Sequence, residues 1–264
     1  TDTKNPRFTV VIVNRLWHHH FGRGIVSSTN DFGIQGQPPT HPALLDWLAM
    51  QLIEHDWSLK HIHSLILSSY TYQQASGFNK EDALADPDNA YYWRFSPRRL
   101  EAEAIRDSIL QATGQLDVRM FGQGTLDESM RRRSIYFTIK RSKLVPMLQV
   151  FDVPEPLVSQ GQRPTTTVAP QALLLLNNPH LRKCCEDSAT ELLKHQLDEA
   201  TQIQMLYQRS LSRQPTDSEA AKAVSFLQSQ TASYTESGVT DAREQATADL
   251  IQLMLCLNEF CYIY

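Results

Sequence analysis

The most constraining feature of this sequence is an arginine set into the apolar stripe of a predicted helix. Ser96 and Pro97 have the pattern of a helix start, a capping residue followed by proline at the first helical position. At 100° per residue, Arg106 falls within a stripe formed by Ala102, Ile105, Ile109 and Leu110. A buried arginine stays charged and needs a carboxylate or carbonyl partner. The helix therefore predicts an internal ionic network flanked by Glu103 and Asp107.

A second arginine takes a similar position between Phe8 and His20. The β-branched run at residues 10–13 favours a strand by propensity alone, but the wider apolar spacing is helical. We predict a buried helix with Arg15 in the middle of its apolar face. The full predicted charged network consists of Arg15, Asp46, Arg99, Glu103, Arg106, Asp107 and Arg133.

Composition indicates an ordinary globular chain. Of its 264 residues 41% are hydrophobic and 20% charged, enough for a sizeable core. The net charge of −4 gives no electrostatic reason to expect nucleic acid or an anionic membrane as partner. No apolar run approaches the roughly 20 residues of a membrane-spanning helix. We expect neither a nucleic-acid partner nor a membrane span.

Helical spacing dominates the rest of the sequence. Further helices are predicted over residues 42–55, 59–69, 170–176, 179–195, 198–212, 216–232 and 240–262. Side chains that would face opposite sides of a strand alternate over Ser134–Ile139, with Ile135, Phe137 and Ile139 on one side. This alternation predicts one strand, in a small β element near residues 133–140. We expect a mainly α, multi-helix single domain. Its core part covers about residues 1–178 and a helical C-terminal subdomain about residues 179–264.

Histidine and cysteine patterns do not favour a metal or covalent haem. Seven of nine histidines precede residue 64, but His18, His19 and His20 diverge by 100° each on a helix. No Cys-x-x-Cys pair is present, and buried thiols are favoured over a disulfide for Cys184, Cys185, Cys256 and Cys261. We expect no metal and no cofactor in this chain.

Other motifs favour structural roles. Glu103 and Asp107 share a helix face, as a glycosidase pair would, but neighbouring arginines would lower their pKa and disfavour a general acid. Residues 86–89 (Asp-Pro-Asp-Asn) predict a turn rather than a calcium loop. Residues 22–24 (Gly-Arg-Gly) predict the turn that ends the first helix rather than a phosphate-binding loop.

One basic cluster surrounds the predicted strand. Its candidate anion or partner surface consists of Arg131, Arg132, Lys140, Arg141, Lys143 and Arg163. One interpretation is an anionic partner, such as a sulfated polysaccharide, phosphate or, as the family resemblance described below implies, an acidic cytochrome surface. The other is a solvated edge strand protected by its charges.

Several runs of the sequence together resemble one known family, the planctomycete-specific domain of unknown function 1553. They span essentially the whole chain in the family's order: NRLWHHHFGRGIV, DFG, PPTHPALLDWLA, HDWSLKHIHSLILSS, DPDN, RRLEAEAIRDSIL, RRSIYFTIKR, FDVPEP, RPTTTVAPQALLLLN, RQPTDSE and NEFCYIY. The resemblance implies the C-terminal module of a large exported planctomycete protein, in the periplasm or at the cell surface. It also implies upstream domains of the same polypeptide as partners, with haem c only on a separate upstream cytochrome module.

The resemblance implies no reaction, so function rests on the charged residues. We expect a non-catalytic interaction or scaffolding module of a cytochrome-associated multidomain protein. One alternative is an enzyme acting on extracellular polysaccharide, with a cleft lined by Arg15, Glu103, Arg106, Asp107 and Arg133. Another is a redox accessory that docks a haem module without binding haem itself.

Overall fold

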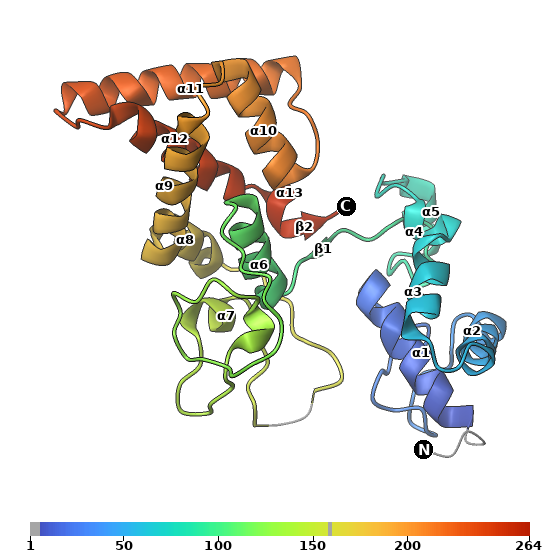
Figure 1. The fold of residues 1–264 in the computed structure, drawn as a ribbon. Coiled ribbons are helices and arrows are strands. Elements are labelled where there is room, and N and C mark those ends of the chain that lie inside the picture. The colour runs from blue at the N-terminus through green and yellow to red at the C-terminus, as the bar shows by residue number, and fades with distance from the viewer. Residues whose placement is uncertain (1–5, 158–159) are drawn as a thin grey trace. The chain divides into compact units, whose positions relative to one another are not determined.

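A computed structural model describes residues 6–157 and 160–264, and it is built mainly of helices (Figure 1). The mainly α fold class is confirmed. The described residues up to Arg98, with Gln160–Gln162 and Tyr264, form one compact unit, called unit 1; the other described residues form unit 2. The predicted subdomain boundary near residue 178 falls inside unit 2. None of the described helices is long and apolar enough to cross a membrane.

Unit 1 is a small helical unit built around the first helix. Its elements are α1 (Pro6–Phe21), α2 (Pro42–Glu54), α3 (Leu59–Leu67), α4 (Tyr70–Gln73) and α5 (Lys80–Ala85). α1 packs against both α2 and α3. The buried side chains come from one face of each helix: Val13, Trp17 and Phe21 of α1, Leu45, Leu48 and Leu52 of α2, and Ile62 and Ile66 of α3.

The helix predicted near the N-terminus forms, but it buries a different face from the predicted one. Its inward side carries Val13, Trp17 and Phe21, spaced four residues apart. Arg15 lies 200° around the helix from Val13 and is exposed, so its predicted burial is wrong. The aromatic rings decide the orientation, because Trp17 and Phe21 stack with centroids 4.3 Å apart in the core.

The buried polar residue of α1 is Asn14, which fastens the loop after the helix. Its Nδ2 donates to the Val26 carbonyl at 3.0 Å, and its Oδ1 accepts from the Val26 amide at 2.8 Å. The Asn14 side chain thus pairs both backbone groups of buried Val26, as a neighbouring strand would do in a sheet. Gly24 permits this approach, since a Cβ there would lie 2.5 Å from the Val26 oxygen and 2.8 Å from Asn14 Nδ2.

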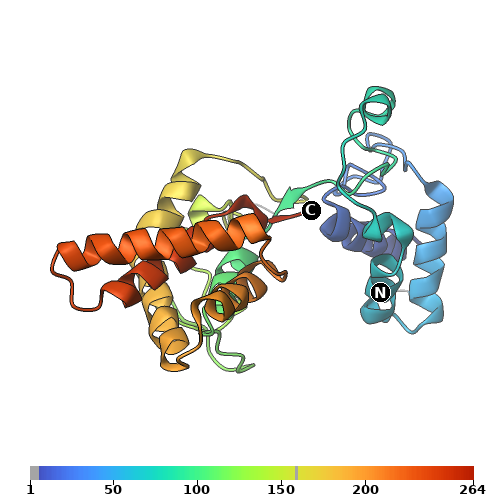
Figure 2. The same ribbon diagram turned by 90° about the horizontal axis from the view of Figure 1, so that it is seen from above.

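Unit 2 holds the remaining elements, packed around α6 and α12. They are β1 (Arg98–Arg99, beginning at the last residue of unit 1), α6 (Ala102–Ala112), the 3₁₀ turn η1 (Ser134–Tyr136), α7 (Pro146–Val150), α8 (Ala169–Asn177), α9 (Pro179–Lys194), α10 (Glu199–Leu211), α11 (Asp217–Glu236), α12 (Ala242–Leu255), α13 (Asn258–Cys261) and β2 (Tyr262–Ile263). Figure 2 shows α11 running beside α12, and α9 contacts α12 as well. The predicted capping box at Thr216 and Glu219 opens α11.

The helix of the Arg106 stripe begins later than predicted. α6 starts at Ala102, and the Ser96 hydroxyl accepts a bond from Asn89 Nδ2 instead of capping a helix. The preceding residues pair with the C-terminal strand, and the Leu100 amide donates to the Cys261 carbonyl at 2.8 Å. Pairing with a partner distant in sequence therefore overrides the local helix-start signal. The predicted 240–262 helix likewise ends at Leu255, before the short α13.

The strand predicted over Ser134–Ile139 is absent, and the described sheet is β1 with β2. The segment begins with the 3₁₀ turn η1 and then makes an isolated bridge from Phe137 to Thr125. Its alternation does not mark a buried face, because Ile135 and Ile139 are 72% and 77% exposed. Only Ser134 and Phe137 of this segment are buried, and both are held by α6 through Arg106.

Replacing Asn14 with alanine should destabilise unit 1 by about 2–4 kcal/mol, because two buried backbone groups of Val26 lose their partner. All four tryptophans lie at or before residue 93, so tryptophan fluorescence during urea unfolding reports on unit 1. The matched control is Arg15→Ala, one residue away and exposed, which should cost less than about 0.5 kcal/mol. Equal losses in the two variants would contradict the helix orientation described above.

Candidate functional site

The guanidinium of Arg106 joins α6 to the loop that follows it. Arg106 is 6% exposed, and its Nη1 donates to the Arg132 carbonyl at 3.0 Å and to Ser134 Oγ at 3.3 Å. Its Nη2 donates to the Met130 carbonyl, and the group lies 4.7 Å from the centre of the Phe137 ring. Burial lowers the pKa of the Arg106 guanidinium, and the negative charge of Asp107 acts in the opposite direction by raising it. Arg106 therefore acts mainly on backbone carbonyls, as a structural cross-link.

Asp107 completes this cross-link from the adjacent position on α6. Its Oδ1 accepts bonds of 2.7 Å from both the amide and the hydroxyl of Ser134. The nearest Arg106 nitrogen is 3.8 Å from the same oxygen, and Arg133 Nε lies 3.6 Å from Oδ2. The structure thus brings together three of the predicted network residues, Arg106, Asp107 and Arg133.

The other predicted network residues lie elsewhere. Buried Arg99 pairs with Asp152 at 2.6 Å, and that carboxylate also accepts from the Thr166 amide and hydroxyl. Glu103 pairs with Arg163 at 2.6 Å, so Arg163 serves a carboxylate rather than a free basic surface. Arg15 and Asp46 are both exposed residues of unit 1. Within unit 2, the five predicted network residues therefore fall into three separate groups rather than one network: Arg99 with Asp152, Glu103 with Arg163, and Arg106 and Arg133 with Asp107.

An apolar pocket lies beside Arg106 in unit 2. Its volume is about 120 Å³, and its apolar lining consists of Ile109, Leu110, Met130, Val145, Met147 and Leu181. Polar and charged groups complete the lining: Arg106, Glu128, Ser129, Arg131, Asn178, His180, Lys183 and Cys184. An apolar interior with a few converging polar groups is typical of binding pockets in proteins. The sequence showed the basic cluster but not this pocket, since its walls come from α6, α7, α9 and an irregular loop.

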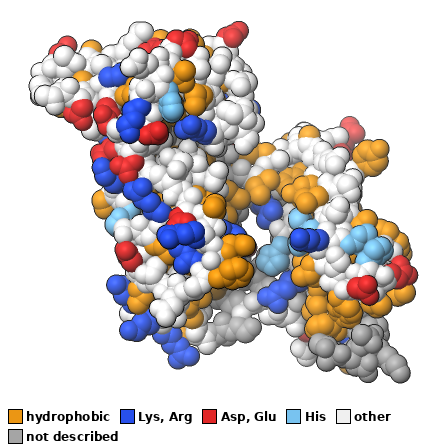
Figure 3. Space-filling view, in the orientation of Figure 1, with side chains coloured by type: hydrophobic (Ala, Val, Ile, Leu, Met, Phe, Trp, Pro, Cys, Tyr) orange, Lys and Arg blue, Asp and Glu red, His pale blue; other side chains and the backbone are white. Residues whose placement is uncertain are grey.

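The loop beside the pocket, residues 117–143, carries most of the predicted basic surface. It contains seven Lys and Arg residues against three Asp and Glu, in a chain whose net charge is −4. Lys140, Arg141 and Lys143 are exposed. Figure 3 shows basic side chains gathered at the lower end of unit 2, where the loops around α7 lie.

Two other basic residues of this loop are held by neighbours. Arg131 shares Asp187 with Lys183, at 2.7 and 3.1 Å, so the pocket rim carries two cations for that carboxylate. Arg132 lies 3.6 Å from the centre of the Tyr136 ring and donates to carbonyls of residues 119–123. The rim cations are thus positioned by contacts within unit 2, while Lys140, Arg141 and Lys143 extend into solvent.

A polar recess of about 470 Å³ lies on the other side of Asp107. It is lined by Ala104, Asp107, Ser108, Gln111, Leu116, Arg133, Arg209, Ser210, Ser212 and Phe260. Asp107 is the one carboxylate among these residues, and Ser134 and Arg133 already contact it. A pair of carboxylates that could act together on a glycosidic bond is not among them.

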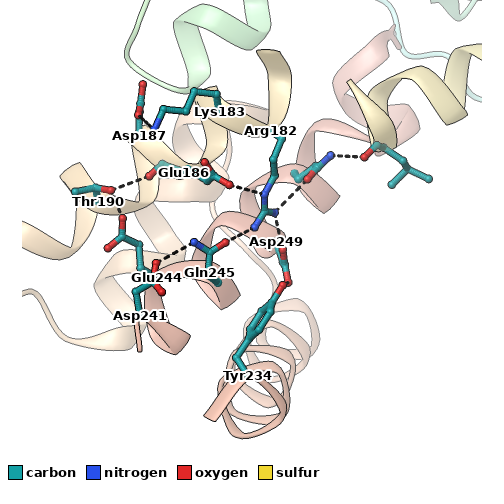
Figure 4. A network of polar contacts seen from close by, with 12 residues as sticks. Arg182, Lys183, Glu186, Asp187, Thr190, Tyr234, Asp241, Glu244, Gln245 and Asp249 are labelled. Carbon is teal, nitrogen blue, oxygen red and sulfur yellow. Dashed lines mark hydrogen bonds and ion pairs between the residues drawn. The ribbon is translucent and has the colours of Figure 1, made fainter. Parts of the chain in front are cut away.

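Sequence reasoning missed a second arginine cross-link, on α9. Arg182 donates to Asp249 at 2.6 Å, to Gln245 at 2.7 Å and to Glu186 at 3.1 Å (Figure 4). Asp249 also accepts from Tyr234, which ties α11 to the same point of α12. Apart from Glu186, these residues lie more than 50 positions from Arg182 in the sequence. The spacing of residues within one helix therefore could not indicate that they contact Arg182 or one another. The network holds α9, α11 and α12 together.

The cysteines have the environment of structural residues, and two histidines of unit 1 contact each other. All four cysteines are free thiols, and burial raises the pKa of Cys185 to about 12 and of Cys261 to about 11. In unit 1, His20 Nε2 and His63 Nδ1 lie 2.7 Å apart. Across residues 6–157 and 160–264, no group of three His, Cys, Asp or Glu side chains is placed to hold a metal ion.

These features define a mainly helical protein with two compact units and a basic-rimmed apolar pocket. The family model for "Protein of unknown function (DUF1553)" matches residues 1–227, and the chain belongs to that family. The match includes all of α1 to α10, and thus both Asn14 and Arg106. No curated protein and no solved structure matches the chain.

Replacing Arg106 with methionine should lower the free energy of unfolding of unit 2 by about 3 kcal/mol, because the carbonyls of Met130 and Arg132 and the hydroxyl of Ser134 lose a buried, charged donor. Urea unfolding followed by far-UV circular dichroism measures the change. The control is Arg133→Ala, which removes the second arginine beside Asp107. Arg133 is 60% exposed and 3.6 Å from its partner, so this loss should be below about 1 kcal/mol. A larger effect of Arg133→Ala would contradict the role assigned to Arg106.

The His20–His63 pair should make unit 1 less stable in mild acid. Burial, followed by the positive charges of His63, Arg98 and His19, lowers the pKa of His20 to about 4. Between pH 6.5 and 4 the unfolded chain binds more protons than the folded chain, so the free energy of unfolding falls as pH falls. Because the ring is partly solvated, we expect a loss of about 1 kcal/mol between pH 7 and pH 5.

Tryptophan-detected urea unfolding at pH 7 and pH 5 tests this dependence. The variant His20→Gln should flatten the pH dependence of unit 1, whereas His195→Gln, exposed in unit 2, should leave it unchanged. If His20→Gln retained the full pH dependence, the destabilising protonation would belong to another group.

Proposed function

We propose that this protein is a non-catalytic interaction module that docks an acidic partner through the apolar pocket beside Arg106. The observation that carries the proposal is a pocket with apolar walls, whose lining holds three cations (Arg106, Arg131 and Lys183) against one carboxylate (Glu128), next to the most basic loop of an acidic chain. The partner segment places one apolar side chain in the pocket, and acidic residues on either side of it meet the rim.

The size of the pocket supports one side chain as its occupant. A dry apolar cavity of roughly 150 Å³ accepts a benzene-sized molecule, and this pocket measures about 120 Å³. Such a volume suits a leucine or phenylalanine side chain better than a sugar chain or a nucleotide. A buried apolar anchor surrounded by a polar rim is the usual energetic arrangement of a protein interface.

The charges around the pocket favour an acidic partner. His180 lines the pocket, and Lys143 is an exposed cation of the neighbouring loop. Hydrogen bonds from Ser129, followed by the positive charges of His180 and Lys143, lower the pKa of Asp127. Exposed cations of this kind steer an oppositely charged partner and add specificity more than affinity. The same loop also exposes the apolar side chains Val118, Met120 and Phe121.

The wider setting of this interaction is also part of the proposal. The family resemblance supports a module of an exported, cytochrome-associated multidomain protein, with upstream domains of the same polypeptide as the first partners. An acidic surface of a c-type cytochrome module fits the basic rim, whereas a sulfated polysaccharide would match the charges without using the apolar pocket.

Binding of a designed peptide tests the docking site directly. The probe is a labelled synthetic peptide with one phenylalanine flanked by aspartates and glutamates, and the comparison peptides carry either serine in place of phenylalanine or lysine flanks. Fluorescence anisotropy with the full chain should show saturable binding of the first peptide alone, weakening steeply as salt is added.

A charge-reversed variant locates the site. Arg141→Glu with Lys143→Glu should weaken binding at least tenfold, while Lys60→Glu with Lys80→Glu, an equal charge change on unit 1, should not. Equal binding of the acidic and lysine-flanked peptides, or full affinity in the Arg141/Lys143 variant, would refute the proposal. Binding that did not depend on the phenylalanine would point to a polyanion instead.

A further inference from the structure

An open recess lies in unit 1, where α1 ends. Its volume is about 440 Å³, and it is lined by His18, Gly22, Arg23, Gly24, Ser27 and Gln162. Gly22 has a φ of +77°, and its amide donates to the His18 carbonyl at 2.7 Å, which makes the predicted turn that ends the helix. Thr29 Oγ1 donates to the Gly161 carbonyl at 3.1 Å and so holds the segment that brings Gln162 to the recess.

Two side-chain nitrogens at this recess are buried without a hydrogen-bond partner among the described residues. They are Arg23 Nε, which is always a donor, and His18 Nδ1, which is a donor in one neutral tautomer and in the protonated ring. Buried polar groups in folded proteins are nearly always paired, so two orphaned nitrogens at one recess indicate a site that takes an acceptor from outside the chain.

The electrostatic environment of the recess is positive. No aspartate or glutamate is among its described lining residues. Burial lowers the pKa of His18, and the positive charges of His19, Arg98 and Arg15 lower it further. The carbonyl end of α1 opposes an anion, but its effect is a partial charge, whereas Arg23 carries a full one. The recess therefore favours an anion over a neutral or cationic ligand.

We infer that the recess at the end of α1 binds a tetrahedral oxyanion, a phosphate or sulfate group, through Arg23, His18 and Ser27. The potential donors come from four places in the chain: the last turn of α1, the glycine turn, the loop after it and residue Gln162. Donors that approach from several directions suit a tetrahedral anion with three or four oxygens. A planar carboxylate needs fewer donors, because one arginine can bind both of its oxygens through two parallel hydrogen bonds. The volume leaves room for a small organic group that carries the anion.

Titration of the full chain with inorganic phosphate, inorganic sulfate and acetate, observed by NMR of arginine Nε–Hε groups, tests the inference. Phosphate, sulfate or both should shift the Arg23 Nε–Hε resonance saturably, and acetate should bind at least tenfold more weakly. A preference between phosphate and sulfate identifies the oxyanion. Absence of saturable shifts at Arg23 with both tetrahedral anions, or equal binding of acetate, would overturn the inference.

Variants separate a built site from general charge attraction. Arg23→Gln should weaken oxyanion binding at least tenfold, Ser27→Ala should weaken it several-fold, and Lys60→Ala, an exposed cation on α3, should leave it unchanged. If Arg23→Gln did not fold, the wild-type titration and Ser27→Ala would still decide the question. Equal weakening by Lys60→Ala would show nonspecific attraction to unit 1 and refute the site.

Discussion

The burial of the Arg106 guanidinium is the interaction on which the arrangement of unit 2 most depends. The residues from Gly114 to Val145 form a long segment that contains one 3₁₀ turn and isolated bridges but no α-helix and no strand. Arg106 binds two of its carbonyls, Asp107 holds Ser134, and Phe137 covers the guanidinium. The same residues form one wall of the apolar pocket, so the stability of the loop and the shape of the pocket have a common origin.

In unit 1 a neutral buried side chain, Asn14, likewise holds a loop by binding its backbone groups. Asn14 binds both backbone groups of Val26, and the glycine turn between them allows the close approach. In each unit a buried polar side chain on a helix satisfies a loop that has no strand beside it. This accounts for the presence of Asn14 in α1 and of Arg106 in the apolar face of α6.

The sequence was most informative where helices are long and local, and least where a distant partner decides. The apolar stripe of α6, the capping box of α11 and most helix positions follow from spacing within one segment. The start of α6 could not be predicted, because Arg98 and Arg99 pair with a strand more than 160 residues away. The Ser134–Ile139 alternation gave a false strand, since the pairing with Thr125 is an isolated bridge and Ile135 and Ile139 stay exposed.

The candidate site, too, combines features that one segment of the sequence encodes with features that depend on distant partners. Composition revealed the basic loop, but charge alone did not show that Arg163 is held by Glu103, or that Arg15 and Asp46 are exposed. The pocket depends on α6, α7 and α9 converging, which no single segment encodes. Because the buried arginines are tied to backbone and carboxylate groups, the charges left for recognition are the exposed ones. In both proposed interactions, recognition rests on positive groups that line recesses, and the buried networks hold the surrounding elements in place.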